Sequence, residues 1–445
     1  MKTKLLLISI VLLGLSVANL FAAVAEGALV KGSGSAIYVI QSGKRCGIAS
    51  LEVFQHKGYK MDQVIKLPDT DLAAIPEGPT IKLAVEPATG STPSPLLELK
   101  GSVNSVDGRN GVQTITVGQG ELIYTLDEIP IRYDGTLSTL RKDGKTMCFF
   151  SSFGCRIKPG GNRRSRHSWF SGPPEDPLKV HLSSKTEQEL WDDNGYYHGT
   201  KEAGLWILAI HQLKNGDLLA ITHAELQYAN DQTYHYRLGL GYSTDQGEHF
   251  TYCGEIVQPA DDTANVGGGA YILRDKYIYA YYNDVDPVSH KRLECVARAN
   301  LEAVVSAAAK HQVTVWNRYR EGQWNIPALS ATPGSNILPR AYGGEDLHSD
   351  AAYCTALDRY LMTVQTHGAH KLLLFSSKDG LDWKQAAIVD ETAENVMQPY
   401  AAFVDYDSPT DDGLVVGNHF YIYYPRMEMN DQNKAPMYRR LITIE

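Results

Sequence analysis

The stretch GLWILAIHQLKNGDLLAITHAE, residues 204–225, predicts the fold of most of this chain. Two apolar runs flank the polar triplet Lys214-Asn215-Gly216. Asn-Gly is typical of tight hairpins, because both central residues of such a turn need positive φ. We therefore expect two antiparallel strands joined at this triplet. The segments GAYILRDKYIYAYYND (269–284) and DAAYCTALDRYLMTV (350–364) repeat the pattern.

Hairpins of this kind recur from about residue 100 to the end of the chain. Their turns fall roughly 60 to 80 residues apart, at Lys142-Asp143-Gly144, Lys214-Asn215-Gly216, Arg274-Asp275-Lys276, Asp358-Arg359 and Asn418. That spacing favours four-stranded blades with decorated loops, whereas a β-sandwich would place its strands more densely. We expect 100–445 to form an all-β domain, a five-bladed β-propeller. Its last strand, 437–445, should pair with a strand within 112–120 and close the ring.

Two short motifs support a propeller. Residues 243–250 read S-T-D-Q-G-E-H-F, and residues 377–383 read S-K-D-G-L-D-W. Both fit the Asp box, in which an Asp caps a tight turn, a Gly takes positive φ and an aromatic ring packs between sheets. We interpret them as markers of the fold, with no residue in contact with substrate.

The hairpins and Asp boxes together resemble the five-bladed propellers of secreted glycoside hydrolases of the arabinanase, xylosidase and fructosidase kind. Sialidases, with six blades, are a more distant resemblance. This resemblance implies an active site at one mouth of the central channel, where the starts of the innermost strands converge. It also implies a carbohydrate substrate, cleaved with two carboxyl groups as acid and base.

Three carboxyl groups are candidates for catalysis. Asp134 resembles the first-blade base of these glycosidases, although Gly135 follows it where many of those families have Pro. Glu225 is our candidate acid, because the polar triplet 223–225, which ends the apolar strand DLLAIT (217–222), is costly unless it faces a wet cavity or is paired. Asp350 is the third, placed to raise the pKa of the acid or to orient substrate.

Several other residues precede or end the innermost strands and are candidates for substrate binding. They are His223, His348, Tyr400, Glu202 and Arg132. In some arabinanase-type propellers a histidine holds a central divalent ion, so His223 and His348 are also candidates for binding Ca²⁺. The chain carries no HExxH motif or Cys/His cluster, and we predict no metal site from the residues themselves.

The first 25 residues predict a cleavable signal peptide, and hence a secreted protein, extracellular or periplasmic. Lys2 and Lys4 form a positive n-region, the apolar stretch 5–17 follows, and Ala23-Val24-Ala25 suits signal peptidase. A membrane anchor is the alternative, but the apolar run is short for a span. Nothing later in the chain is apolar enough to cross a membrane.

Between the signal peptide and the propeller we expect a small α+β module and a linker. Residues 29–80 resemble a repeat found in many secreted bacterial proteins, which implies packing or association with the cell envelope. Residues 84–99 include PATGSTPSP and read as a Pro/Ser/Thr-rich linker.

The overall charge bears on the class of partner, and the cysteine content bears on disulfide bonding. The net charge of −9 argues against a nucleic-acid partner, which would require a basic surface. Six cysteines in an exported chain allow disulfides, and Cys148 with Cys155 is the expected pair.

Two alternatives to the glycosidase stay open. A sialidase would use arginines such as Arg132, Arg237 and Arg298 to clamp a carboxylate, and a non-catalytic propeller would only bind carbohydrate.

Overall fold

The computed structural model describes residues 24–34, 36–48, 54, 57, 59–81, 101–109, 111–125, 134–142, 145–152, 166–173, 177–191, 200–228, 231, 233–290, 292–339, 345–346, 348, 350–366, 370–392, 396–410, 412–428 and 435–445. The chain divides into two compact units, Met1–Ser94 and Pro95–Glu445. The predicted signal peptide and linker lie almost entirely outside the described residues. No helix of the described part is long and apolar enough to cross a membrane.

The first unit contains a small mixed sheet with strand order β3-β2-β1-β4. Its elements are β1 Leu29–Lys31, β2 Ile37–Gln41, β3 Lys44–Gly47, the 3-10 helix η1 Met61–Gln63, β4 Val64–Lys66 and α2 Asp69–Ala74. The first turn of α2 carries Asp69, whose carboxylate accepts hydrogen bonds from the backbone N–H (2.8 Å) and the hydroxyl (2.7 Å) of Ser33. These bonds lower the pKa of Asp69 and tie α2 to the segment that follows β1.

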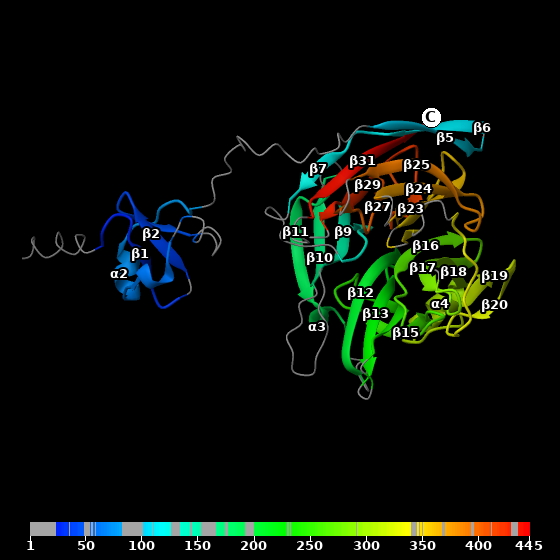
Figure 1. Ribbon diagram of the computed structural model, residues 1–445, viewed down its shortest axis with the longest axis horizontal. Helices are drawn as coiled ribbons and strands as arrows, with labels where there is room; N and C mark the ends of the chain where they lie inside the picture. Colours follow the sequence, from blue (N-terminus) through cyan, green and yellow to red (C-terminus); the bar gives the residue numbers. More distant parts are fainter. Residues whose placement is uncertain are drawn as a thin grey trace, which may run out of the picture. The chain divides into compact units, whose positions relative to one another are not determined.

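The second unit is built almost wholly from antiparallel strands, shown in Figure 1. Its described residues form five larger sheets and the small pair β26 (Val396–Met397) and β30 (Met427–Glu428). In each of the first three sheets the strands follow chain order. The first sheet contains β8 Ser138–Lys142, β9 Lys145–Ser152, β10 Arg166–Gly172 and β11 Val180–Thr186, and the second contains β12 Thr200–Gln212, β13 Leu218–Tyr228, β14 His235–Ser243 and β15 Thr251–Val257. The third sheet contains β16 Gly268–Arg274, β17 Tyr277–Val285, β18 Arg292–Asn300, β19 Asn317–Arg320 and β20 Gln323–Pro327.

The last two sheets include crossovers. One contains β21 Glu345–Asp346, β22 Ala351–Cys354, β23 Arg359–Thr366, β24 Lys371–Ser377, β25 Lys384–Glu391 and β28 Val415–Val416; the other contains β27 Ala402–Val404, β29 His419–Pro425, β31 Met437–Ile444, β5 Ser102–Gly108, β6 Gly111–Val117 and β7 Glu121–Tyr124. Two short helices complete the unit, α3 Glu187–Leu190 and α4 Leu301–Ala308. Asn300 caps α4 by accepting the N–H of Ala303 at 3.0 Å, a role for which asparagine is well suited.

Consecutive sheets lie side by side through their first strands. β8 contacts β12, β12 contacts β16, β16 contacts β22, and β22 contacts β27. Each neighbouring pair buries an apolar cluster, including one between the fifth sheet and the first. Representative pairs are Trp169 with Phe250, Leu240 with Tyr282, Tyr281 with Trp383, Leu374 with Phe403, and Phe150 with Tyr423. This arrangement of an all-β unit is typical of a β-propeller.

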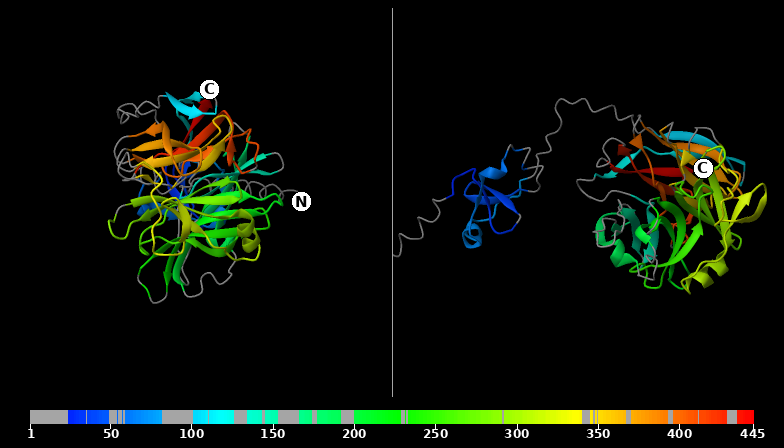
Figure 2. Two further views of the ribbon diagram at one scale, coloured as in Figure 1. Left: turned by 90° about the vertical axis from the view of Figure 1, so that its right-hand side faces the viewer. Right: turned by 60° about the horizontal axis from the view of Figure 1, so that its bottom comes forward.

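The last strand pairs with a strand from the start of the unit, as the sequence predicted. Ile442 lies opposite Val117, and Ile444 lies opposite Ile115. Figures 1 and 2 show the red C-terminal strand β31 beside the cyan strands β5–β7. A pairing of residues more than 300 apart joins the two ends of the unit without a covalent link.

The tight turns contain the contacts that their sequences require. Gly247 and Gly380 have φ of +87° and +71°, and each donates its N–H to the serine that opens its motif, Ser243 or Ser377, at 2.9 Å. The aromatic residue that ends each motif is buried, as Trp383 illustrates at 2 % exposure. Its indole also donates to the carbonyl of Gly380 at 3.1 Å. These turns therefore anchor the outer strands to the core between sheets.

The expected disulfide between Cys148 and Cys155 is not present in the described residues. Cys148 is a free, fully buried thiol in β9, and Cys155 lies outside the described residues. Burial raises the pKa of Cys148 to about 12, because the thiolate would lose its hydration.

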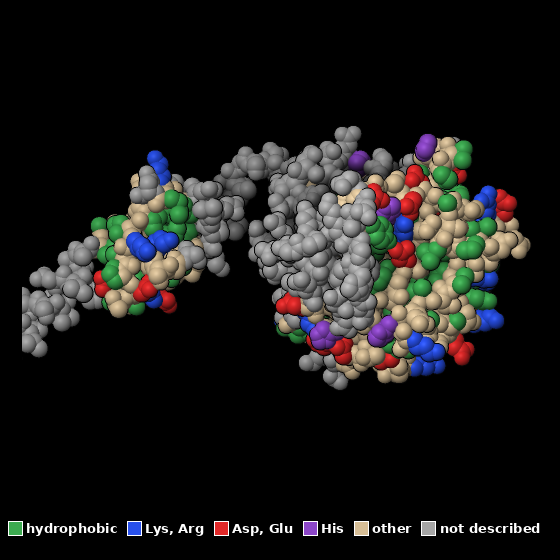
Figure 3. Space-filling model, turned by 90° about the horizontal axis from the view of Figure 1, so that it is seen from below, with side chains coloured by type: hydrophobic (Ala, Val, Ile, Leu, Met, Phe, Trp, Pro, Cys, Tyr) green, Lys and Arg blue, Asp and Glu red, His purple; other side chains and the backbone are tan. Residues whose placement is uncertain are grey.

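Figure 3 shows basic side chains scattered among acidic ones on the face that it presents.

Candidate functional site

Three sheets contribute predicted site residues to one cluster. Asp134 lies just before β8, and Glu225 lies near the end of β13. Tyr400 lies just before β27, and its hydroxyl donates a hydrogen bond of 3.1 Å to Asp134 Oδ1. The charge of Glu225 acts on Asp134 from the second sheet. The ends of strands from the first, second and fifth sheets therefore bring two carboxyl groups together, as the sequence anticipated from the positions of Asp134 and Glu225.

His223 and Glu225 extend the cluster along β13. Residues two apart on a strand point to the same face, and His223 Nε2 lies 3.4 Å from Glu225 Oε1. Both side chains are largely buried, with 10 % and 16 % of their surfaces exposed. The buried Nδ1 of His223 has no hydrogen-bond partner among the described residues. This nitrogen is the polar atom of the cluster that a bound molecule or water would satisfy.

Burial dominates the electrostatics of Asp134. Loss of hydration raises its pKa above the usual range of an aspartate. The hydrogen bond from Tyr400 opposes this rise by stabilising the carboxylate, while the negative charge of Glu225 adds to it. The electrostatic interaction with His223 lowers the pKa of Asp134 by a smaller amount. A carboxylate in such a setting is a stronger base than one in water, which suits proton abstraction near neutral pH.

His348 and Tyr400 form a second edge of the cluster. The backbone N–H of Tyr400 donates to the carbonyl of His348 at 2.7 Å, and the two rings meet edge to face at 5.7 Å. Tyr400 has φ of +59°, a strained conformation for a residue that is not glycine. A Cβ at Gly267 would lie 2.1 Å from the ring of His348, so this position requires glycine. The absence of a side chain at Gly267 thus leaves room for the imidazole of His348.

Asp350, the third candidate carboxyl group, is held by backbone N–H groups from two sheets. Its two oxygens accept the N–H groups of Phe403 (3.0 Å) and Ala351 (2.8 Å). Its pKa is raised to about 7, mainly by burial and to a smaller extent by the charge of Asp412, while the two backbone N–H groups act to lower it. Asp350 and Asp412 both line a cavity of about 10 Å³, the size of a single water. The sequence correctly indicated that Asp350 lies at the start of a strand. It could not show that the carboxylate accepts hydrogen bonds from the backbone N–H groups of Phe403 and Ala351.

The other predicted ligands take no part in the described cluster. Arg132 and the side chain of Glu202 lie outside the described residues. The described residues contain no group of three or more His, Cys, Asp or Glu side chains suited to a metal ion. Among the described residues, His223 lies 3.4 Å from Glu225 and His348 packs against Gly267, and the Ca²⁺ site that the resemblance allowed stays a prediction.

Two aromatic residues of the site were not anticipated. Trp206 lies opposite His223 in the β12–β13 register, with ring centroids 5.9 Å apart, and its indole covers Gly204. Tyr236 on β14 stacks on the other side of His223 at 5.9 Å. Counting back from the predicted turn at Asn215 would have placed a residue near 207 opposite His223. A bulge between Ile207 and Ala209 shifts that register by one.

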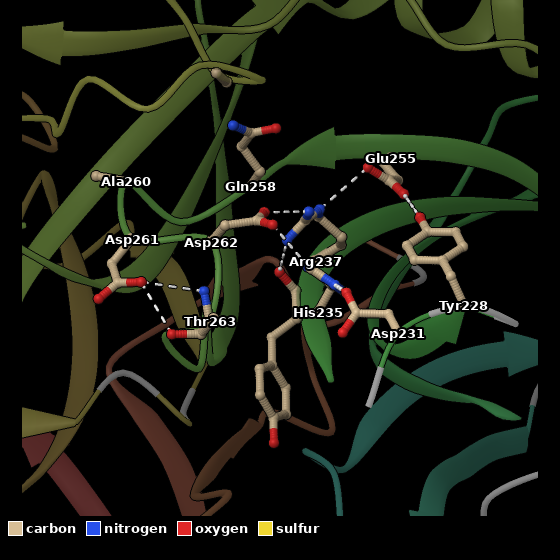
Figure 4. Close-up of polar contacts among 12 residues, drawn as sticks. Tyr228, Asp231, His235, Arg237, Glu255, Gln258, Ala260, Asp261, Asp262 and Thr263 are labelled. Atoms are coloured by element: carbon tan, nitrogen blue, oxygen red, sulfur yellow. Dashed lines mark hydrogen bonds and ion pairs between the residues drawn. The ribbon is translucent and has the colours of Figure 1, made fainter. Parts of the chain in front are cut away.

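Behind this aromatic wall, a charged network holds the segment 258–263 (Figure 4). Arg237 pairs with Glu255 at 3.2 Å and with Asp262 at 2.5 Å. His235 bridges two carboxylates, with Nε2 2.8 Å from Asp231 and Nδ1 2.7 Å from Asp262. His235 therefore joins two carboxylates that come from different segments of the chain. The hydrogen bond from His235 lowers the pKa of Asp231 to about 2.

The same segment is held from its other side by the third sheet. Arg318, fully buried, donates to the carbonyl of Gln258, and Asp284 accepts the N–H of Ala260 at 2.8 Å. The chain continues from here to Gly267, which supports His348. The two networks therefore set the position of one wall of the cluster.

Of the arginines named for a sialidase, the two within the described residues, Arg237 and Arg298, have other partners. Arg237 is buried in the network just described. The guanidinium of Arg298 lies 4.2 Å from the ring centre of Tyr277 and 4.1 Å from that of Trp324, which places it in an aromatic stack. Neither side chain is available to clamp the carboxylate of a sugar acid, so the described residues give no support to that alternative.

No protein-family model and no curated protein matches this chain. Solved structures with a similar fold include the catalytic domain of the GH62 α-L-arabinofuranosidase of Coprinopsis cinerea, which is 12 % identical with a TM-score of 0.41 and covers 78 % of this chain and 98 % of that one. A family 117 glycoside hydrolase of Zobellia galactanivorans is 12 % identical with a TM-score of 0.43, covering 77 % and 90 %. A glycoside hydrolase described from Parabacteroides distasonis is 11 % identical with a TM-score of 0.42, covering 79 % and 95 %. Likeness at this level carries no functional weight, so the assignment below depends on the side chains.

Proposed function

We propose that this chain is a glycoside hydrolase whose second unit is a five-bladed β-propeller, with Asp134 and Glu225 as its essential carboxyl groups. The observation that carries the proposal is their convergence from two sheets into one cluster with His223 and Tyr400. Paired carboxyl groups of this kind are what cleavage of a glycosidic bond requires. The substrate class is a carbohydrate polymer without charged groups.

The two carboxyl groups divide the work as base and acid. Asp134, made more basic by burial, takes a proton from the attacking water or attacks the sugar itself. Glu225 donates its proton to the leaving oxygen as the C–O bond breaks, and it ends ionised beside His223. Tyr400 holds Asp134 through its hydroxyl and so is a positioning residue, in addition to the sugar-binding role expected from its place in the sequence.

The remaining side chains supply a binding surface for sugar. His348, supported by Gly267, and Tyr236, stacked on His223, border the cluster. We further propose that the chain acts outside the cytoplasm after removal of residues 1–25, and that 29–80 associates with the cell envelope. Both proposals come from the sequence.

The test begins with a screen of neutral plant, fungal and bacterial polysaccharides for released reducing ends. On whichever polymer is cut, Asp134→Asn and Glu225→Gln should each lower kcat at least ~10²-fold, the usual contribution of one acid–base group. Asp382→Asn, an exposed carboxylate in a distant turn, is the matched control and should retain full activity. Wild-type turnover in both site variants would remove the pair from the mechanism. Binding without cleavage would support the carbohydrate-binding alternative.

A further inference from the structure

A pocket of about 480 Å³ lies at the hairpin ends of the strands. This is within the size range of small-molecule sites. Four segments line it: the turn after β12, the end of β16, the β22–β23 hairpin and the stretch 409–415. Its polar and aromatic lining residues include His211, Gln212, Lys214, Tyr353, Tyr360 and Asp412.

This pocket is separate from the carboxyl pair. In the β12–β13 hairpin, Gly204 lies opposite Glu225, while Gln212 lies opposite Leu218 beside the turn. Eight residues of extended strand span roughly 26 Å at about 3.3 Å per residue. A molecule in the pocket is therefore too far from Glu225 to be its reacting substrate.

The walls of the pocket are held in place before any ligand binds. Asp412 accepts a hydrogen bond from Nδ1 of His211, which fixes the imidazole. The Lys214 turn is closed by two backbone bonds, from Leu213 N–H to Asp217 O at 2.8 Å and from Gly216 N–H to Leu213 O at 2.9 Å. Across the pocket, the hydroxyl of Ser408 donates to Val415 O at 2.6 Å. A preformed site of this kind costs a ligand little ordering entropy.

The chemistry of the lining selects a neutral molecule with apolar faces and polar edges. The hydroxyls of Tyr353 and Tyr360 bind Asp358 and the carbonyl of Leu273, so these tyrosines offer their rings. The side-chain Oε1 of Gln212 is buried and has no hydrogen-bond partner within the described residues. Asp412 is hydrogen-bonded to His211, and the exposed ammonium group of Lys214 is a further donor.

We propose that this pocket is a second, non-catalytic binding site for a neutral oligosaccharide. A sugar ring has C–H faces that suit tyrosine rings and hydroxyls that suit an amide and an ammonium group. The choice of a sugar as ligand rests on the proposed function, because both sites would then hold parts of one polymer. Binding here would keep the enzyme on its substrate while the carboxyl pair acts elsewhere.

The experiment uses the full chain carrying Asp134→Asn, titrated calorimetrically with cellotriose, xylotriose and arabinotriose. We expect at least one of them to bind at this pocket, and Gln212→Leu or Lys214→Ala to weaken that binding at least ~10-fold. Gln323→Leu and Lys384→Ala, exposed residues elsewhere, are matched controls and should leave the affinity unchanged. Unchanged melting temperatures would show that all variants are folded.

Hydrogen exchange locates the bound sugar. Protection of the turn 213–217 supports the proposal. Protection confined to 200–206 and 223–228, affinity unaffected by Gln212→Leu, or no binding by any of the three sugars would overturn it. The proposed catalysis is tested separately by cleavage with the wild-type chain. Binding at the pocket without any cleavage would leave this proposal standing and defeat the hydrolase.

Discussion

The hydroxyl of Tyr400 donates a 3.1 Å hydrogen bond to the carboxylate of Asp134, across a separation of 266 residues in sequence. This bond links the segment before β27 in the fifth sheet with the segment before β8 in the first sheet. It also stabilises the charged form of Asp134 against the burial that raises its pKa. Tyr400 itself is held with positive φ beside His348, so the bond depends on a strained backbone.

Tyr400→Phe should therefore shift the pH profile of catalysis. Removing a donor from a carboxylate destabilises its charged form, so the pKa of Asp134 rises further. A hydrogen bond to a charged group contributes about 1.5–3 kcal/mol, which corresponds to roughly one to two pH units. We expect the acidic limb of kcat/KM to move up by that amount, with activity lost first at low pH. Tyr242→Phe, which removes a hydroxyl bound to Asp217, is the control. An unmoved acidic limb would mean that Asp134 is not the group that titrates.

Gly267→Ala should perturb the site with little effect on the fold. The added methyl would lie 2.1 Å from Cε1 of His348, so the imidazole must move. We expect KM for the polymer to rise several-fold and the melting temperature to fall by only a few degrees. Gly34→Ala, where no atom lies within 4 Å of the new Cβ, is the matched control. If the KM effect persists unchanged when His348→Ala is added, the imidazole is not the group that the methyl displaces.

Asp350 should make folding stability depend on pH. Its pKa in the folded state, about 7, lies above its value in the unfolded chain, near 3.8. The contribution is therefore fully present below about pH 4 and is lost as the pH rises through 7, by up to about 4 kcal/mol. Asp350→Asn cannot ionise, although it gives up one acceptor for the N–H groups of Phe403 and Ala351. We expect the wild type to lose stability relative to this variant between pH 4 and 8 in denaturant titrations. Parallel pH curves for the two proteins would contradict the assignment.

Arg237→Met should loosen the wall of the site. It removes the guanidinium that bonds to both Glu255 and Asp262, and of these two carboxylates only Asp262 keeps its contact with His235. We expect a loss of about 1–3 kcal/mol in unfolding free energy, because charge-assisted hydrogen bonds contribute on that scale. Amide exchange should accelerate within 258–266. Arg320→Met, which breaks an exposed pair with Glu321, should change neither quantity. Equal exchange rates in the two variants would show that the network does not hold the segment.

Local signals in the sequence were sufficient for the turns and for the strand order. The hairpin at Asn215-Gly216, the cap at Asn300 and the pairing of β31 with β6 all follow from residues whose preferences act over a few neighbours or along one apolar strand. Asp134, Glu225, His223, His348 and Tyr400 could be selected because they are polar residues at the ends of apolar strands.

The sequence by itself determined that alternating apolar strands and Gly- or Asp-containing turns would make an all-β unit, because side-chain period and turn geometry are local properties. Only the tertiary structure decided which carboxyl groups meet. Asp350 has the same local pattern as Asp134, yet backbone N–H groups capture it while Asp134 faces Glu225. Trp206 reaches His223 through a bulge, and Gly267 serves a histidine 81 positions later in the chain. Such contacts depend on how separate sheets pack, and burial, which sets the pKa values of both carboxyl groups, exists only once they have packed.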